Sequence, residues 1–252
     1  EAKPYFQLEK TIEAAFSCSE RLFGWEFKAL DVPLYHKDCR AWEVTRAGTH
    51  VAVFIGDYFA RASKRSGAWC SAFRAQRKFP DVQAPIEVNV CNFAKGDPAL
   101  LPQEMLDKVL AAATYDMGFQ TVEYVASALV DLAFHEGEPP ADPMVKQAEV
   151  LAEIGMPEAI VMRHATPHFA HVFTGDGYSS GYYSYMWSEV MDADAFEAFE
   201  EAGGAFDPAM AGKLEEFILS AGGSEEADVL YTKFRGRMPG VDALLKGRGL
   251  AA

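Results

Sequence analysis

The chain has 252 residues, enough to bury a substantial hydrophobic core in one large or two small domains. Of these residues 50% are hydrophobic and 24% are charged, and the formal net charge is −14. This acidic balance disfavours non-specific binding to nucleic acid or to an anionic membrane surface, and no apolar run is long enough to span a bilayer. We therefore expect no nucleic-acid partner and no membrane association.

The four cysteines lie far apart in the sequence, at positions 18, 39, 70 and 91, and form no Cys-x-x-Cys pair. This spacing supports neither a disulfide framework nor a cysteine-based zinc site. We expect reduced thiols in a cytoplasmic protein.

The first part of the chain combines one helix with a hairpin. Apolar residues recur at helical spacing over Tyr5–Phe23, and Gly24 ends the pattern. The period then changes to that of strands. Ala41–Val44 and Val51–Ile55 predict two antiparallel strands joined by a turn through Ala47-Gly48.

A third strand is predicted at Ile86–Cys91, where apolar and polar residues alternate. The segment Arg61–Gly67, between the hairpin and this strand, is a basic loop. Two interpretations of the loop remain open: its arginines bind the carboxylate of a short peptide, or it is a solvated loop.

The rest of the chain is predicted to be helical. The helical pattern begins at Pro102 and predicts two consecutive amphipathic helices with a break near Gly118. A loop follows over Glu136–Pro143. Further helices are predicted over Val145–Ile154, Tyr182–Phe199, Pro208–Leu219 and Glu225–Phe234. No repeat or composition shift marks a boundary, so we predict a single domain over 1–252, mainly α with a small antiparallel β-sheet.

The stretch from His164 to Glu189 is the richest in functional side chains. It holds three histidines, four tyrosines and three glycines. Tyrosine and histidine donate hydrogen bonds to a developing oxyanion, and glycines let the backbone approach a ligand closely. This composition indicates a ligand-binding or catalytic loop.

Several motifs resemble, in the same order, those of the thimet oligopeptidase and peptidyl-dipeptidase family of zinc metallopeptidases. They lie at Leu34–Asp38, Trp42–Val44, Asp57–Arg61, Lys64–Trp69, Val88–Phe93, Thr114–Leu132, His171–Glu189 and Phe234–Arg237. The resemblance implies the fold of the catalytic half of a zincin-like oligopeptidase, hydrolysis of short peptides, and zinc as the family's cofactor. It also implies that Val88–Phe93 is a strand at the sheet edge, against which substrate lies.

The resemblance implies roles for individual residues. His171 and Tyr178 match a loop that closes over peptide, and Tyr185 lies on the following helix, so these three are the catalytic candidates. The substrate-binding candidates are Tyr182, Gly175, Gly177 and Asn89. The alternative is that the aromatic residues form the core at a helix start, which is the interpretation we favour for Tyr183 and Trp187.

The family's zinc motif, His-Glu-x-x-His, is absent from this chain. Flanking motifs match but run together near 101–102, which predicts an internal deletion there. His135-Glu136 begins like the motif, but Pro139 stands where the second histidine belongs. His164, His168 and His171 have spacings that suit ligands on a helix, but Pro167 disfavours a regular helix through them, so structural histidines are favoured. No metal ligand is assigned, and the residues present support no cofactor.

Three functions remain open: a zinc oligopeptidase whose metal-bearing segment lies elsewhere, a non-catalytic relative that binds peptides, and a self-associating remnant. Loss of a central helix should expose Phe93, Phe119, Val122 and Leu129, which predicts self-association or a partner chain that completes the core. We expect any surviving peptide site to lie between Val88–Asn92 and His171–Tyr185.

Overall fold

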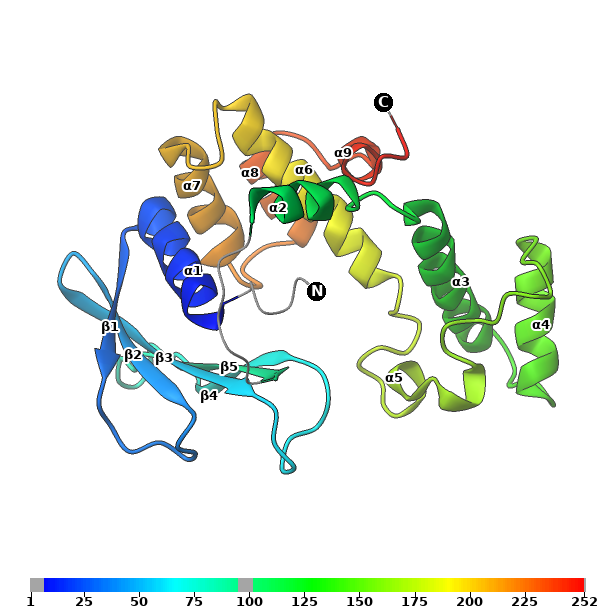
Figure 1. Ribbon diagram of the computed structural model, residues 1–252, viewed down its shortest axis with the longest axis horizontal. Coiled ribbons are helices and arrows are strands. Elements are labelled where there is room, and N and C mark those ends of the chain that lie inside the picture. The colour runs from blue at the N-terminus through cyan, green and yellow to red at the C-terminus, as the bar shows by residue number, and fades with distance from the viewer. Residues whose placement is uncertain (1–6, 95–101, 252) are drawn as a thin grey trace. The chain divides into compact units, whose positions relative to one another are not determined.

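The computed structural model describes residues 7–94 and 102–251 (Figure 1). The chain divides into two compact units. The first comprises residues 1–106 and 206–220, and the second comprises residues 107–205 and 221–252. The single domain over 1–252 stays a prediction. Leu101, on one side of the predicted deletion, lies outside the described residues.

The first unit contains a five-stranded sheet, a helix from the start of the chain and a helical segment from residues 208–219. Its elements are α1 (Leu8–Phe23), β1 (Trp25–Leu30), β2 (Arg40–Arg46), β3 (Thr49–Phe59), β4 (Trp69–Arg74), β5 (Ile86–Phe93), α7 (Pro208–Leu214) and a π-helical turn at Glu215–Leu219. Helix α2 (Gln103–Ala111) contains the boundary between the units.

Local sequence signals account for the helix and the hairpin of this unit. Helix α1 ends where Gly24 adopts a left-handed φ of 67° and donates its N–H to the carbonyl of Glu20. In the β2–β3 turn, Ala47 and Gly48 have φ values of 48° and 74°, both positive as a type I′ turn requires. Over the described residues, the predicted helix and hairpin are confirmed.

The sheet has the strand order β1-β2-β3-β5-β4. Strands β3 and β5 run parallel, and the other neighbouring pairs are antiparallel. The prediction of a purely antiparallel sheet is therefore wrong, because the chain crosses over through β4 before it returns as β5. The predicted edge position of Val88–Phe93 is also wrong: β5 lies between β3 and β4, and hydrogen-bonds to both.

Both faces of the sheet carry a small apolar core. On one face α1 packs through Ile12 and Phe16 against Trp42, and the ring of Phe16 stacks on Phe27 with centroids 3.9 Å apart. On the other face a second cluster forms from Cys39, Ala41, Ile55, Val88 and Val90. Alternate residues of β2, β3 and β5 supply the two faces, as the pleat of a strand requires.

The second unit is helical. Its elements are α3 (Met117–His135), α4 (Pro143–Glu153), a 3₁₀ turn at Thr166–His168, α5 (Ala170–Phe173), α6 (Ser184–Glu201), α8 (Ala227–Arg235) and α9 (Asp242–Gly247). One core cluster joins α3, α4 and α5 through Val130, Val150, Met162, Phe169 and Val172.

Sequence periodicity predicts most of these helices. The break near Gly118 is confirmed, because α2 ends at Ala111 and α3 begins at Met117. The expectation that Pro167 interrupts the histidine-rich stretch is confirmed too, since a 3₁₀ turn and then the short helix α5 replace a continuous helix. None of the helices formed by residues 7–94 and 102–251 is both long and apolar enough to cross a membrane.

The predicted exposure of apolar side chains is confirmed. Phe93, Phe119, Val122 and Leu129 are 50%, 50%, 52% and 36% exposed. The last three lie along α3, where no neighbour covers them fully.

Candidate functional site

Three predicted catalytic residues meet in the second unit. His171 lies on α5, Tyr178 on the loop that follows, and Tyr185 at the start of α6. Nε2 of His171 lies 2.8 Å from the hydroxyl of Tyr185. The rings of Tyr178 and Tyr185 stack with centroids 5.9 Å apart, and the ring of Tyr178 lies 4.3 Å from that of His171. We call these three residues, together with Tyr182, the tyrosine–histidine cluster.

Tyr182 forms the inner side of this cluster. Its ring centroid lies 5.5 Å from that of Tyr185 and 5.8 Å from that of His171, and its hydroxyl lies 3.4 Å from Nε2 of His164. A cavity of about 340 Å³ opens beside these rings, lined by His164, His168, Phe169, Ala170, His171, Tyr182 and Tyr185. Because Tyr178 and Tyr185 are 44% and 39% exposed, a ligand can reach them from solvent.

The electrostatics of the cluster favour hydrogen-bond donors. Burial, followed by the hydrogen bond with Tyr178, raises the pKa of Tyr185 to about 12, so its hydroxyl stays protonated at neutral pH. Burial and then the charge of Arg163 lower the pKa of His164, which favours a neutral imidazole beside Tyr182. These groups suit binding of a carbonyl or carboxylate oxygen rather than nucleophilic attack.

The glycines of the loop between α5 and α6 do not adopt left-handed backbone conformations. Gly175 and Gly177 have open space around them, but neither has a positive φ. The left-handed residue of this loop is Ser180, with a φ of 56°. The role of Gly175 and Gly177 in substrate binding stays a prediction. The expectation that Tyr183 and Trp187 belong to the core is wrong, because both side chains are exposed.

Asn89, the remaining substrate-binding candidate, lies on β5 in the first unit. Its Oδ1 accepts a hydrogen bond of 3.2 Å from the thiol of Cys91. Because β5 is an interior strand, its backbone is paired on both sides and does not offer an open edge to a peptide. The role of Asn89, and a peptide site shared with Val88–Asn92, stay predictions.

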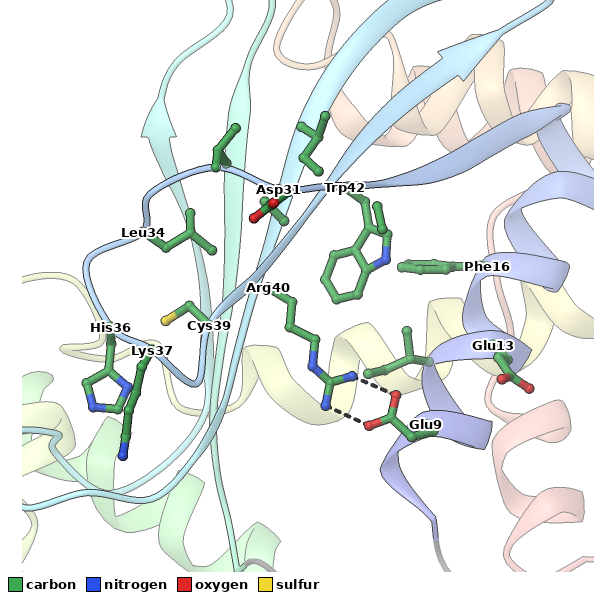
Figure 2. A pocket seen from close by; sticks show the side chains of 15 residues that line it. Glu9, Glu13, Phe16, Asp31, Leu34, His36, Lys37, Cys39, Arg40 and Trp42 are labelled. Atoms are coloured by element: carbon green, nitrogen blue, oxygen red, sulfur yellow. Dashed lines mark hydrogen bonds and ion pairs between the residues drawn. The ribbon is translucent and has the colours of Figure 1, made fainter.

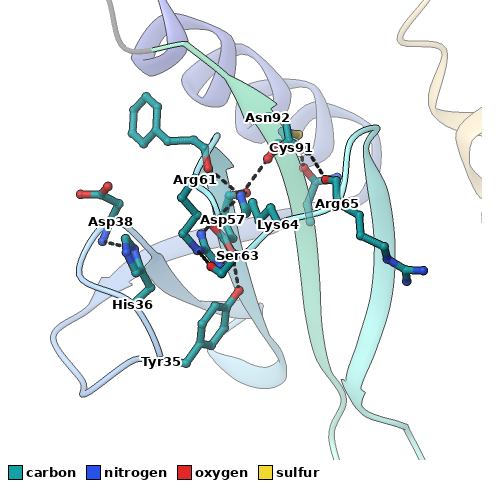
Figure 3. A network of polar contacts seen from close by, with 12 residues as sticks. Tyr35, His36, Asp38, Asp57, Arg61, Ser63, Lys64, Arg65, Cys91 and Asn92 are labelled. Atoms are coloured by element: carbon teal, nitrogen blue, oxygen red, sulfur yellow. Dashed lines mark hydrogen bonds and ion pairs between the residues drawn. The ribbon is translucent and has the colours of Figure 1, made fainter.

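The basic loop Arg61–Gly67 surrounds a buried carboxylate (Figure 3). Both oxygens of Asp57 accept hydrogen bonds from the guanidinium of Arg61, at 2.7 and 2.8 Å. The side chain of Lys64 is only 3% exposed, and its ammonium donates to the carbonyls of Asp57, Phe59 and Cys91. Arg61 and Lys64 are therefore engaged within the protein, which favours a structural role for this part of the loop.

This network lowers the pKa of the Asp57 carboxyl group. Burial by itself raises the pKa of Asp57, but hydrogen bonds from Arg61, Lys64 and Tyr35 outweigh that effect. The net result is a pKa well below the ordinary value of a carboxyl group. The network thus holds a charged group inside the first unit by pairing it completely.

A larger cavity of about 600 Å³ in the first unit lies between α1 and β2 (Figure 2). Glu9 and Arg40, two of its charged lining residues, pair through two hydrogen bonds of 2.6 Å each. None of the predicted site residues lines this cavity. It therefore adds no member to the tyrosine–histidine cluster.

The residues of the described segments do not fit a zinc site. A zinc site needs three protein ligands close together. Within residues 7–94 and 102–251, no group of three His, Cys, Asp or Glu side chains is placed to hold a metal ion. His135 instead lies 2.8 Å from the carbonyl of Asp131, and His164 and His171 lie against tyrosine hydroxyls.

Sequence reasoning missed two residues that hold this site. Asp131 is fully buried on α3, and its two oxygens accept hydrogen bonds from the backbone N–H groups of Ser180 and Tyr182, at 3.1 and 3.0 Å. Tyr124, on the same helix, donates its hydroxyl to the carbonyl of Tyr182. The available signal was an acidic residue inside the apolar run Ala128–Ala133.

Comparison with known proteins identifies the relatives of this chain. The model of peptidase family M3 matches residues 1–105 and 99–250. The chain belongs to peptidase family M3. The family resemblance seen in the sequence motifs is thereby confirmed.

Similar M3 proteins include bacterial and plant peptidases. Dipeptidyl carboxypeptidase of Escherichia coli K12 is 29% identical over 327 residues, which cover 98% of this chain and 47% of that protein. Oligopeptidase A of the same organism is 30% identical over 328 residues, covering 98% and 48%. An organellar oligopeptidase A of Arabidopsis thaliana is 27% identical over 346 residues, covering 100% and 43%. The chain thus spans about half the length of the curated relatives that it matches.

Proposed function

We propose that this M3 chain binds short peptides at the tyrosine–histidine cluster and does not hydrolyse them. The observation that carries the proposal is the convergence of Tyr178, Tyr182 and Tyr185 on His171 beside an open cavity. The similar proteins are a dipeptidyl carboxypeptidase and oligopeptidases, whose names indicate peptide substrates.

Peptide recognition in this proposal depends on hydroxyl donors. Tyr178 and Tyr185 donate hydrogen bonds to carbonyl oxygens of the peptide. The raised pKa of Tyr185 keeps its hydroxyl protonated across the physiological range. Tyr182 contacts the bound peptide from the wall of the cavity. The affinity is weak, since few contacts must offset the entropy lost when loop and peptide become ordered.

In this proposal the chain does not hydrolyse peptides, because it lacks the residues that bind zinc in the family. In the family, a water bound to zinc has its pKa lowered to about 7, far below that of bulk water, and this activates it as the nucleophile. The chain contains no His-Glu-x-x-His, and we place the deletion of that segment near 101–102. Two features support the placement: the family model matches in two parts that meet at residues 99–105, and the relatives align over more residues than this chain contains.

Two measurements on the purified full chain test the proposal. Calorimetric titration with an unblocked five-residue peptide should give saturable, weak binding. Incubation of the same peptide with protein and micromolar zinc should give no cleavage products by mass spectrometry. Absence of binding at millimolar peptide contradicts the first half of the proposal. Stoichiometric zinc with chelator-sensitive cleavage contradicts the second half.

A second candidate function is completion of the fold by another chain. The observation that favours it is the exposed apolar surface of Phe119 and Val122, which border a cavity of about 260 Å³ in the second unit. Contiguous exposed apolar side chains commonly mark an interface. Sedimentation velocity over a wide concentration range tests this candidate. A single monomeric species at every concentration contradicts self-association.

A further inference from the structure

The loop that carries the tyrosine–histidine cluster is tied to helix α3 by one buried carboxylate. Asp131 lies inside the second unit with no exposed surface. One of its oxygens accepts the N–H of Ser180 at 3.1 Å, and the other accepts the N–H of Tyr182 at 3.0 Å. Nδ1 of His135 lies 3.0 Å from the first oxygen. Hydrogen bonds from backbone N–H groups to a carboxylate are stronger than those between neutral groups.

A second tie comes from Tyr124, about two helical turns before Asp131 on the same helix. Its hydroxyl donates to the carbonyl of Tyr182 and accepts the N–H of Met186 at 3.2 Å. Its ring also stacks on that of Tyr182, with centroids 5.2 Å apart. Asp131 and Tyr124 therefore hold the backbone on both sides of Tyr182, up to the first turn of α6.

The backbone at this point needs such support. Ser180 has a φ of 56°, a left-handed conformation that costs free energy for a residue other than glycine. Residues in this region keep such a conformation when the surroundings fix it. The N–H of Ser180 donates one of the two backbone hydrogen bonds that Asp131 accepts. The carboxylate therefore contacts the residue that has the unfavourable backbone conformation.

We propose that Asp131 and Tyr124 are positioning residues that hold the loop at 180–186 so that Tyr182 and Tyr185 face the peptide. This inference rests on the proposed peptide-binding function. Neither residue lines the cavity beside the cluster, so both act through the backbone that they hold. Pre-organised side chains raise affinity because less conformational entropy is lost when the ligand binds.

The test combines two substitutions with a matched control. Tyr124→Phe keeps the stacked ring and removes the hydroxyl that contacts Tyr182 and Met186. Asp131→Asn keeps the shape and replaces one acceptor oxygen with a donor. Asp194→Asn is the control. Asp194 is equally buried in the same unit, but it accepts hydrogen bonds from Tyr231 and Arg235 and has no contact with the cluster.

Amide hydrogen exchange gives a readout that does not depend on peptide binding. Tyr124→Phe should speed exchange at Met186, and Asp131→Asn should speed it at Ser180 and Tyr182, by about tenfold or more in each case. Both variants should bind the five-residue peptide about tenfold more weakly, whereas Asp194→Asn should retain the affinity of the unmodified chain.

Each outcome distinguishes the two claims. If the unmodified chain does not bind peptide, the proposed function is wrong, and exchange at residues 180–186 still decides whether α3 positions the loop. Unchanged exchange in both variants would overturn the positioning role. Faster exchange with unchanged affinity would show that the ties exist but do not serve binding, which also overturns the inference. Equal loss of affinity in Asp194→Asn would indicate a general effect of stability rather than positioning.

Discussion

Removal of a single hydroxyl separates the binding role of the cluster from its structural role. Tyr185→Phe deletes the oxygen that lies 2.8 Å from Nε2 of His171 and leaves the stacking of the ring on Tyr178 in place. Because Tyr185 is partly exposed, water replaces the lost partner of His171. The substitution should therefore affect ligand binding more than folding.

The magnitude follows from the type of hydrogen bond. A neutral hydrogen bond contributes about 0.5–1.5 kcal/mol to stability, and the lower end applies at an exposed site. For a chain of this size, 1 kcal/mol corresponds to a change in Tm of about 2–4 °C, so we expect a smaller decrease than that. Loss of a donor to a peptide carbonyl should raise Kd by about five- to tenfold, since 1.4 kcal/mol corresponds to a factor of ten.

The matched control is Tyr231→Phe in the same unit. The hydroxyl of Tyr231 is buried and donates to the carboxylate of Asp194 at 2.7 Å. A hydrogen bond to a charged group contributes about 1.5–3 kcal/mol, so this variant should lose more stability and retain the peptide affinity.

Calorimetric titration and thermal unfolding of the two variants provide the assay. We expect opposite patterns: Tyr185→Phe loses affinity and has only a small decrease in Tm, and Tyr231→Phe has a larger decrease in Tm and keeps its affinity. Unchanged affinity in Tyr185→Phe, or equal loss in both variants, would refute the assignment of the Tyr185 hydroxyl to peptide binding.

Three further predictions concern the first unit and the exposed surface of α3. Lys64→Met should lower the free energy of unfolding by about 1–3 kcal/mol in urea titrations, because Arg61 still pairs with Asp57 but three backbone carbonyls lose their buried donor; an unchanged free energy would contradict this. Folding lowers the pKa of Asp57 from its ordinary value of 3.8. The ionised carboxylate therefore stabilises the fold fully at pH values above 3.8, and this stabilisation is lost as the pH falls from 3.8 toward the lowered pKa. The stability difference between the unmodified chain and Asp57→Asn should thus shrink from pH 7 to pH 3, and a constant difference would exclude this linkage. Replacing Phe119 and Val122 with serine should reduce self-association in light scattering, and unchanged association would place the interface elsewhere.

Sequence patterns predicted the helices and strands that are determined by neighbouring residues. Helix α1 and the β2–β3 hairpin are specified by periodicity and by the positive φ at Ala47-Gly48. Strand β4 was missed because all six of its residues are exposed, so no alternation between apolar and polar positions exists to reveal it. The parallel pairing of β3 with β5 was missed because it depends on tertiary contacts and not on either strand's own pattern.

The same distinction applies to the candidate site. The residues of the cluster lie within 15 positions of one another, from His171 to Tyr185, so the sequence alone was enough to single them out. Asp131 reaches its partner Tyr182 from 51 positions away, and only the folded chain shows that contact. A buried carboxylate inside an apolar helix indicates that a partner exists but not which one.

The most direct test of the central claim is a residue-resolved titration. The isotopically labelled full chain would be titrated with the unblocked five-residue peptide in the presence of zinc, and amide shifts and peptide integrity would be followed in the same sample. We predict saturable shifts at residues 171–185, centred on Tyr178 and Tyr185, with the peptide intact throughout. Shifts confined to other surfaces would contradict peptide binding at the tyrosine–histidine cluster. Peptide fragments whose formation a chelator suppresses would contradict the absence of hydrolysis.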